Sequence, residues 1–187
     1  ERTSAGGYLR EDLDALEGLA AEVGSAESWM VVADVAQAGG DFARAAAALD
    51  RACERAGASA DRRRLISAAI DLAELASDHL GDRRRANRAR NLAAAALATG
   101  ARHDELRRAV AIDALRIGEL DEARGAIETI PVDRRSTADW MLWVSALRRA
   151  GELTRAIDGL RAARAQLDDD GVQLLTTLER DRAAAHR

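Results

Sequence analysis

The residues that could bind a metal or carry out catalysis are few, and their spacing suits neither role. The histidines are His79, His103 and His186, and none has a cysteine or a second histidine three or four positions away to complete a zinc site. The acidic run 168–170 lacks the alternating ligands and the final glutamate of a calcium loop, so it is predicted to be a solvated turn that starts a helix. No nucleophile motif G-x-S-x-G and no nucleotide-binding G-x-G-x-x-G after a strand occurs. The sequence therefore predicts no catalytic residue, no metal ligand and no cofactor.

Arginine runs that follow an aspartate are a stronger chemical signal. All 28 residues counted as lysine or arginine are arginine, and runs of them follow Asp61, Asp82 and Asp133. Each aspartate is predicted to be a helix N-cap, which places its arginines in the first turn, where the helix dipole disfavours a cation by about 0.3–1 kcal/mol. Two kinds of interaction could offset this cost. The arginines pair with acidic side chains of neighbouring helices, which we favour, or they bind an anionic ligand.

The composition indicates a helical protein and argues against general affinity for nucleic acid. The net charge of −4 and the isoelectric point of about 5.5 are unlike those of nucleic-acid-binding domains, which are usually basic. Hydrophobic residues make up 48% of the 187 residues but aromatic residues only 3%, so the core must consist mainly of alanine and aliphatic side chains. The single cysteine, Cys53, is predicted to be a small apolar filler of a helix rather than a reactive thiol. No apolar run approaches the roughly 18 residues that cross a membrane.

Four blocks of the chain share one pattern, in which two helical stretches are joined by a glycine turn. The turn glycines are Gly40, Gly81, Gly118 and Gly151, each followed by an aspartate or a glutamate. The predicted blocks span residues 28–57, 61–100, 104–131 and 134–167. Single amphipathic helices at 8–24 and 171–187 are predicted to cap the two ends, because a stack of helix pairs needs a polar outer face at each end.

The fourth block, with Trp140 and Leu147 before its turn and Ala156, Leu160 and Ala163 after it, resembles a tetratricopeptide repeat (TPR). The first block matches the same slots and includes Trp29. The second and third blocks depart from the family pattern, since Arg90 takes a large apolar slot and Arg107 takes the tryptophan slot. The resemblance implies an all-α fold with degenerate repeats. The expected fold is a single domain over residues 1–187. It would be an α-solenoid of about four antiparallel helix pairs in a right-handed superhelix, with capping helices at both ends. The alternative fold is a globular all-helical bundle.

The resemblance also implies where a partner would bind. In TPR stacks the first helix of each pair lines a concave groove, at the residue after the tryptophan slot and about one turn to either side. Transferred to this sequence, these positions predict the following partner-binding residues: Glu27, Met30, Asp34, Ile70, Glu74, Arg108, Ile112, Leu115, Met141 and Arg148. Gln37, Ser67, Ser77 and several others occupy equivalent positions. The family's clamp of lysine, asparagine and arginine for a peptide carboxyl terminus is absent, so a chaperone tail is not the expected partner.

Apolar side chains in the slot after the tryptophan predict what the groove binds. Met30, Ile70 and Met141 share this slot and would form a stripe that receives the hydrophobic face of a partner helix or extended segment. Charged neighbours such as Glu27 and Glu74 would rim the stripe and set the orientation of the partner. The alternative is that the groove walls or the terminal helix cover these residues.

The predicted function is a non-catalytic protein–protein interaction module or scaffold. Its partner would be a peptide or helix of another protein, or another domain of the parent chain. The alternative is an arginine-rich helical-repeat binder of an anionic ligand or nucleic acid, which a salt titration would distinguish. An enzyme and a membrane partner are not expected. The expected compartment is the cytoplasm, and a signal peptide removed before Glu1 is the alternative.

Overall fold

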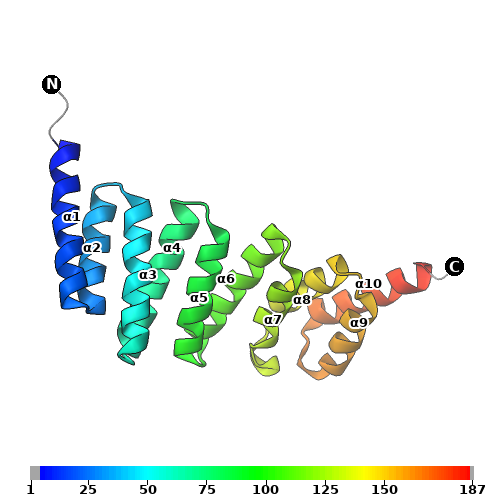
Figure 1. The fold of residues 1–187 in the computed structure, drawn as a ribbon. Coiled ribbons are helices and arrows are strands. Elements are labelled where there is room, and N and C mark those ends of the chain that lie inside the picture. Colours follow the sequence, from blue (N-terminus) through cyan, green and yellow to red (C-terminus); the bar gives the residue numbers. More distant parts are fainter. Residues whose placement is uncertain (1–4, 186–187) are drawn as a thin grey trace. The chain divides into compact units, whose positions relative to one another are not determined.

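The computed structural model describes residues 5–185, including the side chains of residues 11–184, and every regular element in this range is a helix (Figure 1). The α-helices are α1 (Ala5–Val23), α2 (Ala26–Ala38), α3 (Phe42–Ala58), α4 (Arg62–Asp78), α5 (Arg83–Leu97), α6 (Ala101–Ile117), α7 (Leu120–Glu128), α8 (Thr137–Arg149), α9 (Leu153–Ala162) and α10 (Asp169–Ala185). Short 3-10 helices, η1 (Val132–Arg134) and η2 (Arg164–Gln166), follow α7 and α9. The predicted all-α class is confirmed for the described residues.

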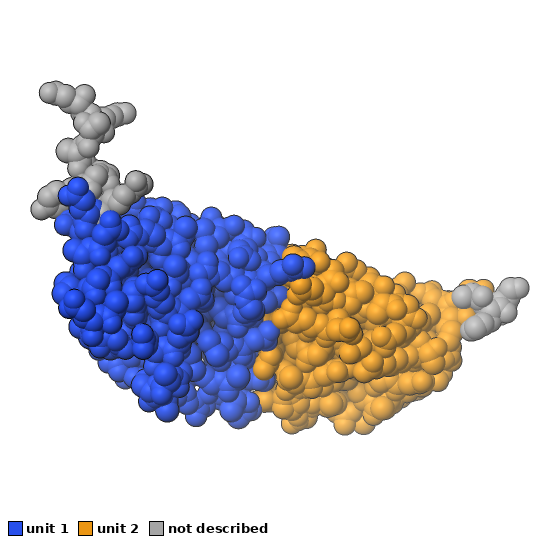
Figure 2. Space-filling view, viewed as in Figure 1, with its two compact units in different colours: residues 1–103 blue, residues 104–187 orange. Residues whose placement is uncertain are grey.

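The helices occur in the predicted order, and consecutive helices pack on one another. Contacts join α1 to α2 and so on through α5, and join α7 to α8, α8 to α9 and α9 to α10. The final helix begins at Asp169 rather than at 171, and residues 186–187 of the predicted helix lie outside the described residues. The chain forms two compact units, unit 1 (Glu1–His103) and unit 2 (Asp104–Arg187), which are described separately (Figure 2).

The predicted glycine turns are confirmed, and their backbone conformation explains the residue type. Gly40, Gly81, Gly118 and Gly151 have φ between +64° and +81°, in the left-handed region that a side chain disfavours. After three of these glycines the next residue donates its amide to the carbonyl five positions earlier, as Glu152 does to Leu147 at 2.8 Å. This bond satisfies a carbonyl at the end of the first helix and reverses the chain. The turn at Gly81 contains one more residue, because Asp82 donates to Ala76, six positions earlier.

The core of unit 1 consists mainly of alanine, whereas the core of unit 2 contains more leucine, isoleucine, valine and tryptophan. Trp29 and Trp140, which occupy the tryptophan slot of the first and fourth blocks, are buried and each only 3% exposed. In unit 2 the rings of Trp140 and Trp143 meet edge to face with centroids 5.7 Å apart. Trp143 lies directly against Gly159 of α9, where an added Cβ would be 2.3 Å from its Cη2 atom. Gly159 therefore allows the tryptophan to pack on the backbone of α9.

The predicted N-cap role is correct for Asp61 and Asp82 and wrong for Asp133. Asp61 and Asp82 each accept the amide of the arginine three positions later, at 3.1 and 2.9 Å. Asp133 instead lies in η1, which follows Pro131. The N-cap of α8 is Ser136, because Ser136 and Asp139 form a reciprocal capping box, in which the Ser136 amide donates to the Asp139 carboxylate at 2.8 Å. Arg134 and Arg135 consequently precede the helix.

Candidate interaction groove

In unit 1, ion pairs connect each helix from α3 to α5 with the helix two positions earlier. The cation is in each case the arginine at the third helical position, whose amide also donates to the N-cap aspartate. The pairs are Arg44 with Asp14 and Glu17 on α1, Arg64 with Glu27 on α2, and Arg85 with Asp50 on α3. These pairs offset the unfavourable dipole at each helix start. They also hold alternate helices such as α2 and α4 side by side, and α2 and α4 are in contact.

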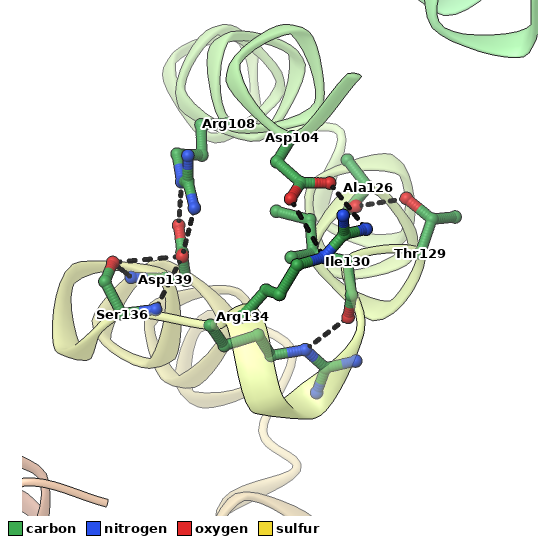
Figure 3. Close-up of polar contacts among 9 residues, drawn as sticks. Asp104, Arg108, Ala126, Thr129, Ile130, Arg134, Ser136 and Asp139 are labelled. Atoms are coloured by element: carbon green, nitrogen blue, oxygen red, sulfur yellow. Dashed lines mark hydrogen bonds and ion pairs between the residues drawn. The ribbon is translucent and has the colours of Figure 1, made fainter. Parts of the chain in front are cut away.

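Unit 2 uses the same position in a helix for two further pairs. Arg155, the third residue of α9, lies 3.4 Å from Glu128 of α7. At the third position of α8 the signs are reversed, because Asp139 accepts two hydrogen bonds from Arg108 of α6, at 2.7 and 3.0 Å (Figure 3). Alternate helices are therefore joined in both units.

The arginine runs are largely engaged within the protein. Pairing with acidic side chains of other helices is confirmed for Arg64 and Arg85, and Arg134 of η1 lies 3.3 Å from Asp104 of α6. Arg62, at the start of α4, donates to the carbonyl of Leu97 at the end of α5. The start of α4 thus lies beside the end of α5. The runs after Asp61 and Asp82 consequently begin at opposite ends of this helix pair and do not form a continuous strip.

Two adjoining hollows lie between α2 and α4 in unit 1. The first, the methionine hollow, has a volume of about 420 Å³ and is lined by Glu27, Met30, Val31, Asp34, Asp61, Arg63, Arg64 and Ser67. The second, the acidic hollow, has a volume of about 290 Å³ and is lined by Ala33, Asp34, Gln37, Leu49, Asp71, Glu74, Leu75, Asp78 and His79. Asp34 belongs to both. Together they form a groove along the facing sides of the two helices.

The structure brings most of the groove residues predicted for unit 1 together. Glu27, Met30 and Asp34 line the methionine hollow, and Asp34 and Glu74 line the acidic hollow. Gln37 and Ser67, at equivalent predicted positions, are also lining residues. Ile70 is half-buried on α4 and lines neither hollow. Four of the five residues predicted for unit 1 therefore share one surface. That this surface binds a partner stays a prediction.

The acidic hollow concentrates negative charge that no arginine of the described residues pairs with. Its walls carry the carboxylates of Asp34, Asp71, Glu74 and Asp78. Within the described residues none of these four forms an ion pair with an arginine. Burial, and after it the nearby charges of Glu74 and Asp34, raise the pKa of Asp71 above its ordinary value. At its edge the ring of His79 stacks on Phe42 with centroids 4.0 Å apart.

The predicted residues of unit 2 are more dispersed. Met141 is 55% exposed on α8 and Ile112 is 38% exposed on α6. Leu115 is half-buried and packs against the small alanine cluster of α6, α7 and α8. Arg148 is exposed, and its guanidinium lies 4.0 Å from Asp181 of α10.

Arg108, one of the predicted partner-binding residues, is engaged in the ion pair with the fully buried Asp139. Burial alone would raise the pKa of Asp139, but hydrogen bonds from Arg108 and Ser136 outweigh it and hold the pKa below its ordinary value. The guanidinium of Arg108 therefore neutralises a buried charge.

Several groove residues were missed from the sequence. Asp71 and Asp78 lie about one helical turn to either side of Glu74, so their spacing places all three on one face of α4. That spacing was a usable signal, but transferring positions from the TPR pattern selected only Glu74. Val31, which is 48% exposed, was missed because it lies one residue beyond the expected slot.

The remaining candidate chemistry is sparse. Cys53 is buried, and desolvation raises the pKa of its thiol to about 12, which keeps it unreactive near neutral pH. Among the described residues no group of histidine, cysteine, aspartate and glutamate side chains is arranged to hold a metal ion. No described helix is both long and apolar enough to cross a membrane.

Comparison of the sequence with protein-family models and with curated proteins finds no match.

Proposed function

We propose that the chain is a non-catalytic interaction module, built as a TPR-like α-solenoid, whose groove binds a segment of a partner protein. The solenoid arrangement is supported by ion pairs that join α4, α5 and α9 to the helix two positions earlier. Such contacts are expected when helix pairs stack in one direction, because each pair then meets only its neighbours. The left-handed glycine turns recur at the position that the TPR pattern assigns to them.

One observation carries the binding role. First-helix positions that the repeat pattern predicts as partner-binding, such as Met30, Asp34 and Glu74, line two adjoining hollows between α2 and α4. Methionine is an adaptable contact for a partner of irregular shape. The two methionines of the chain are Met30, which is half-buried, and Met141, which is exposed. The anion-binding alternative has less support, because arginines of all three runs already bind carboxylates or backbone carbonyls.

The proposal is tested by comparing proteins that the wild type captures from an extract of its source cells with those captured by a Met30→Asp, Met141→Asp variant. We expect the double variant to lose a defined set of proteins while its melting temperature is unchanged. Leu92→Asp on α5 is the matched control, since Leu92 is 40% exposed and lies on a second helix of a pair. The control should retain the captured set. Unchanged capture by the folded double variant would show that these first-helix surfaces are not the binding site.

A further inference from the structure

We propose that the groove of unit 1 binds a peptide segment that places an apolar side chain in the methionine hollow and an arginine or lysine side chain in the acidic hollow. This inference rests on the proposed function and specifies the chemistry of its partner. Figure 2 shows the surface of unit 1 in blue.

The charge of the acidic hollow is unusual for this chain. At two other places in unit 1 a carboxylate is paired with an arginine of the helix two positions later, Glu27 with Arg64 and Asp50 with Arg85. The four carboxylates of the acidic hollow face one another without such a partner in the described part of the chain, although the chain contains 28 arginines. Like charges at close range repel one another, and a cation from a partner would relieve that repulsion.

The floor of the acidic hollow suits the stem of a long cationic side chain. Ala33, Leu49 and Leu75 are buried and form its apolar part. Arginine and lysine bury their methylene stems against such surfaces while the charged end group reaches polar neighbours. A planar guanidinium can in addition bind carboxylates in a bidentate manner, which favours arginine over lysine.

The distance between the hollows sets the spacing of the two side chains in the partner. Met30 and Gln37 mark the two hollows on α2 and are separated by two helical turns, or roughly 10 Å along the axis. A segment in the polyproline II conformation rises about 3.1 Å per residue and has three residues per turn, so it would need the apolar and basic residues about three positions apart, on the same face. A helical segment lying along the groove would need them about seven positions apart.

The experiment begins with selection of a display library of short linear peptides on the full chain. We expect enrichment of peptides that carry arginine or lysine at one of these two spacings from leucine, methionine or another apolar residue. The most enriched peptide is then labelled with fluorescein, and its affinity is measured by fluorescence anisotropy at physiological ionic strength. A second version of the peptide carries citrulline in place of arginine, which removes the charge and keeps the shape.

Variants of the protein test the site directly. Glu74→Gln, Asp78→Asn should weaken binding of the basic peptide by about tenfold or more, because charge-assisted hydrogen bonds are lost. Citrulline should weaken binding to the wild type by a similar factor and have little further effect on the double variant. The control is Asp12→Asn, Glu54→Gln, which changes the net charge equally on α1 and α3, outside both hollows, and should leave the affinity within about twofold.

The failure of this inference can be distinguished from failure of the proposed function. Enriched peptides without a basic residue, or basic peptides bound equally by the Glu74→Gln, Asp78→Asn variant, would overturn the inference. If Met30→Asp still abolished their binding, the groove would remain the binding site. Absence of any enriched peptide would also overturn the inference, and the capture experiment would then decide the proposed function.

Discussion

Asp139 is a buried carboxylate whose charge is held by two neighbouring residues. It is completely buried and is held by Arg108 from α6 and by Ser136 from its own helix cap. The capping box is visible in the sequence, because serine and aspartate are three positions apart. The partner Arg108 lies 31 positions away, and no local pattern connects the two.

We expect Arg108→Ala to lower the free energy of unfolding by about 3 kcal/mol, because it leaves the buried Asp139 charge without its main partner. Chemical denaturation at neutral pH measures the change. The control is Arg161→Ala, which removes the exposed pair with Glu179 and should reduce stability by about 1 kcal/mol or less. Equal effects of the two substitutions would show that the Arg108 pair is not buried as described.

The same pair predicts a dependence of stability on pH. The pKa of Asp139 is lower in the folded than in the unfolded protein, so its contribution is present above the ordinary aspartate pKa of about 3.9 and is lost as the pH falls below it. Denaturation over a pH series should show this acid-side loss in the wild type. Arg108→Ala should show a smaller loss, because the pKa of Asp139 is then no longer held down.

Gly159 has a role that only the packed structure shows. The sequence offers no reason to distinguish it from Gly125, because both interrupt predicted helices. Gly159→Ala should lower the free energy of unfolding by about 1–3 kcal/mol, since the new methyl group would collide with the buried Trp143 ring. Gly125→Ala on α7 is the matched control. Nothing lies within 4 Å of its added Cβ, so this change should be neutral or slightly stabilising. Equal destabilisation would contradict the packing of Trp143 on α9.

The helices and their turns could be predicted from the sequence because their signals are local. Apolar positions at helical spacing, glycine turns and N-cap aspartates lie within a few residues of the structure that they determine. The prediction failed at Asp133, where a second capping signal, Ser136 with Asp139, lies three residues further on. An aspartate before arginines was therefore not sufficient to identify a helix start.

The ion pairs between alternate helices should be measurable as a coupling energy. Arg85 of α5 and Asp50 of α3 form such a pair, and both side chains are partly exposed. A double-mutant cycle with alanine at both positions should give a coupling of about 0.5–1 kcal/mol that decreases with added salt. A coupling of zero at low salt would show that this contact does not help to hold alternate helices together.

The sequence predicted most of the residues that line the groove in unit 1 but not its acidic character. The repeat pattern identified first-helix residues that line the two hollows, because the pattern reports which side of each helix faces a neighbour. It emphasised the apolar stripe of Met30, Ile70 and Met141, whereas Ile70 lines neither hollow and the largest unpaired charge is acidic. Unpaired charge depends on which side chains find partners on other helices. A single sequence does not contain that information.

Chemical-shift mapping of the ¹⁵N-labelled protein, titrated with the most enriched basic peptide, tests the groove most directly. We predict that the largest shifts of backbone amides occur on the facing sides of α2 and α4, at residues such as Met30, Asp34 and Glu74. Amides on the far side of α3 and α5, such as those of Glu54 and Leu92, should be little affected. Shifts concentrated on α3 and α5, with α2 and α4 unchanged, would contradict the assignment of the groove as the binding site.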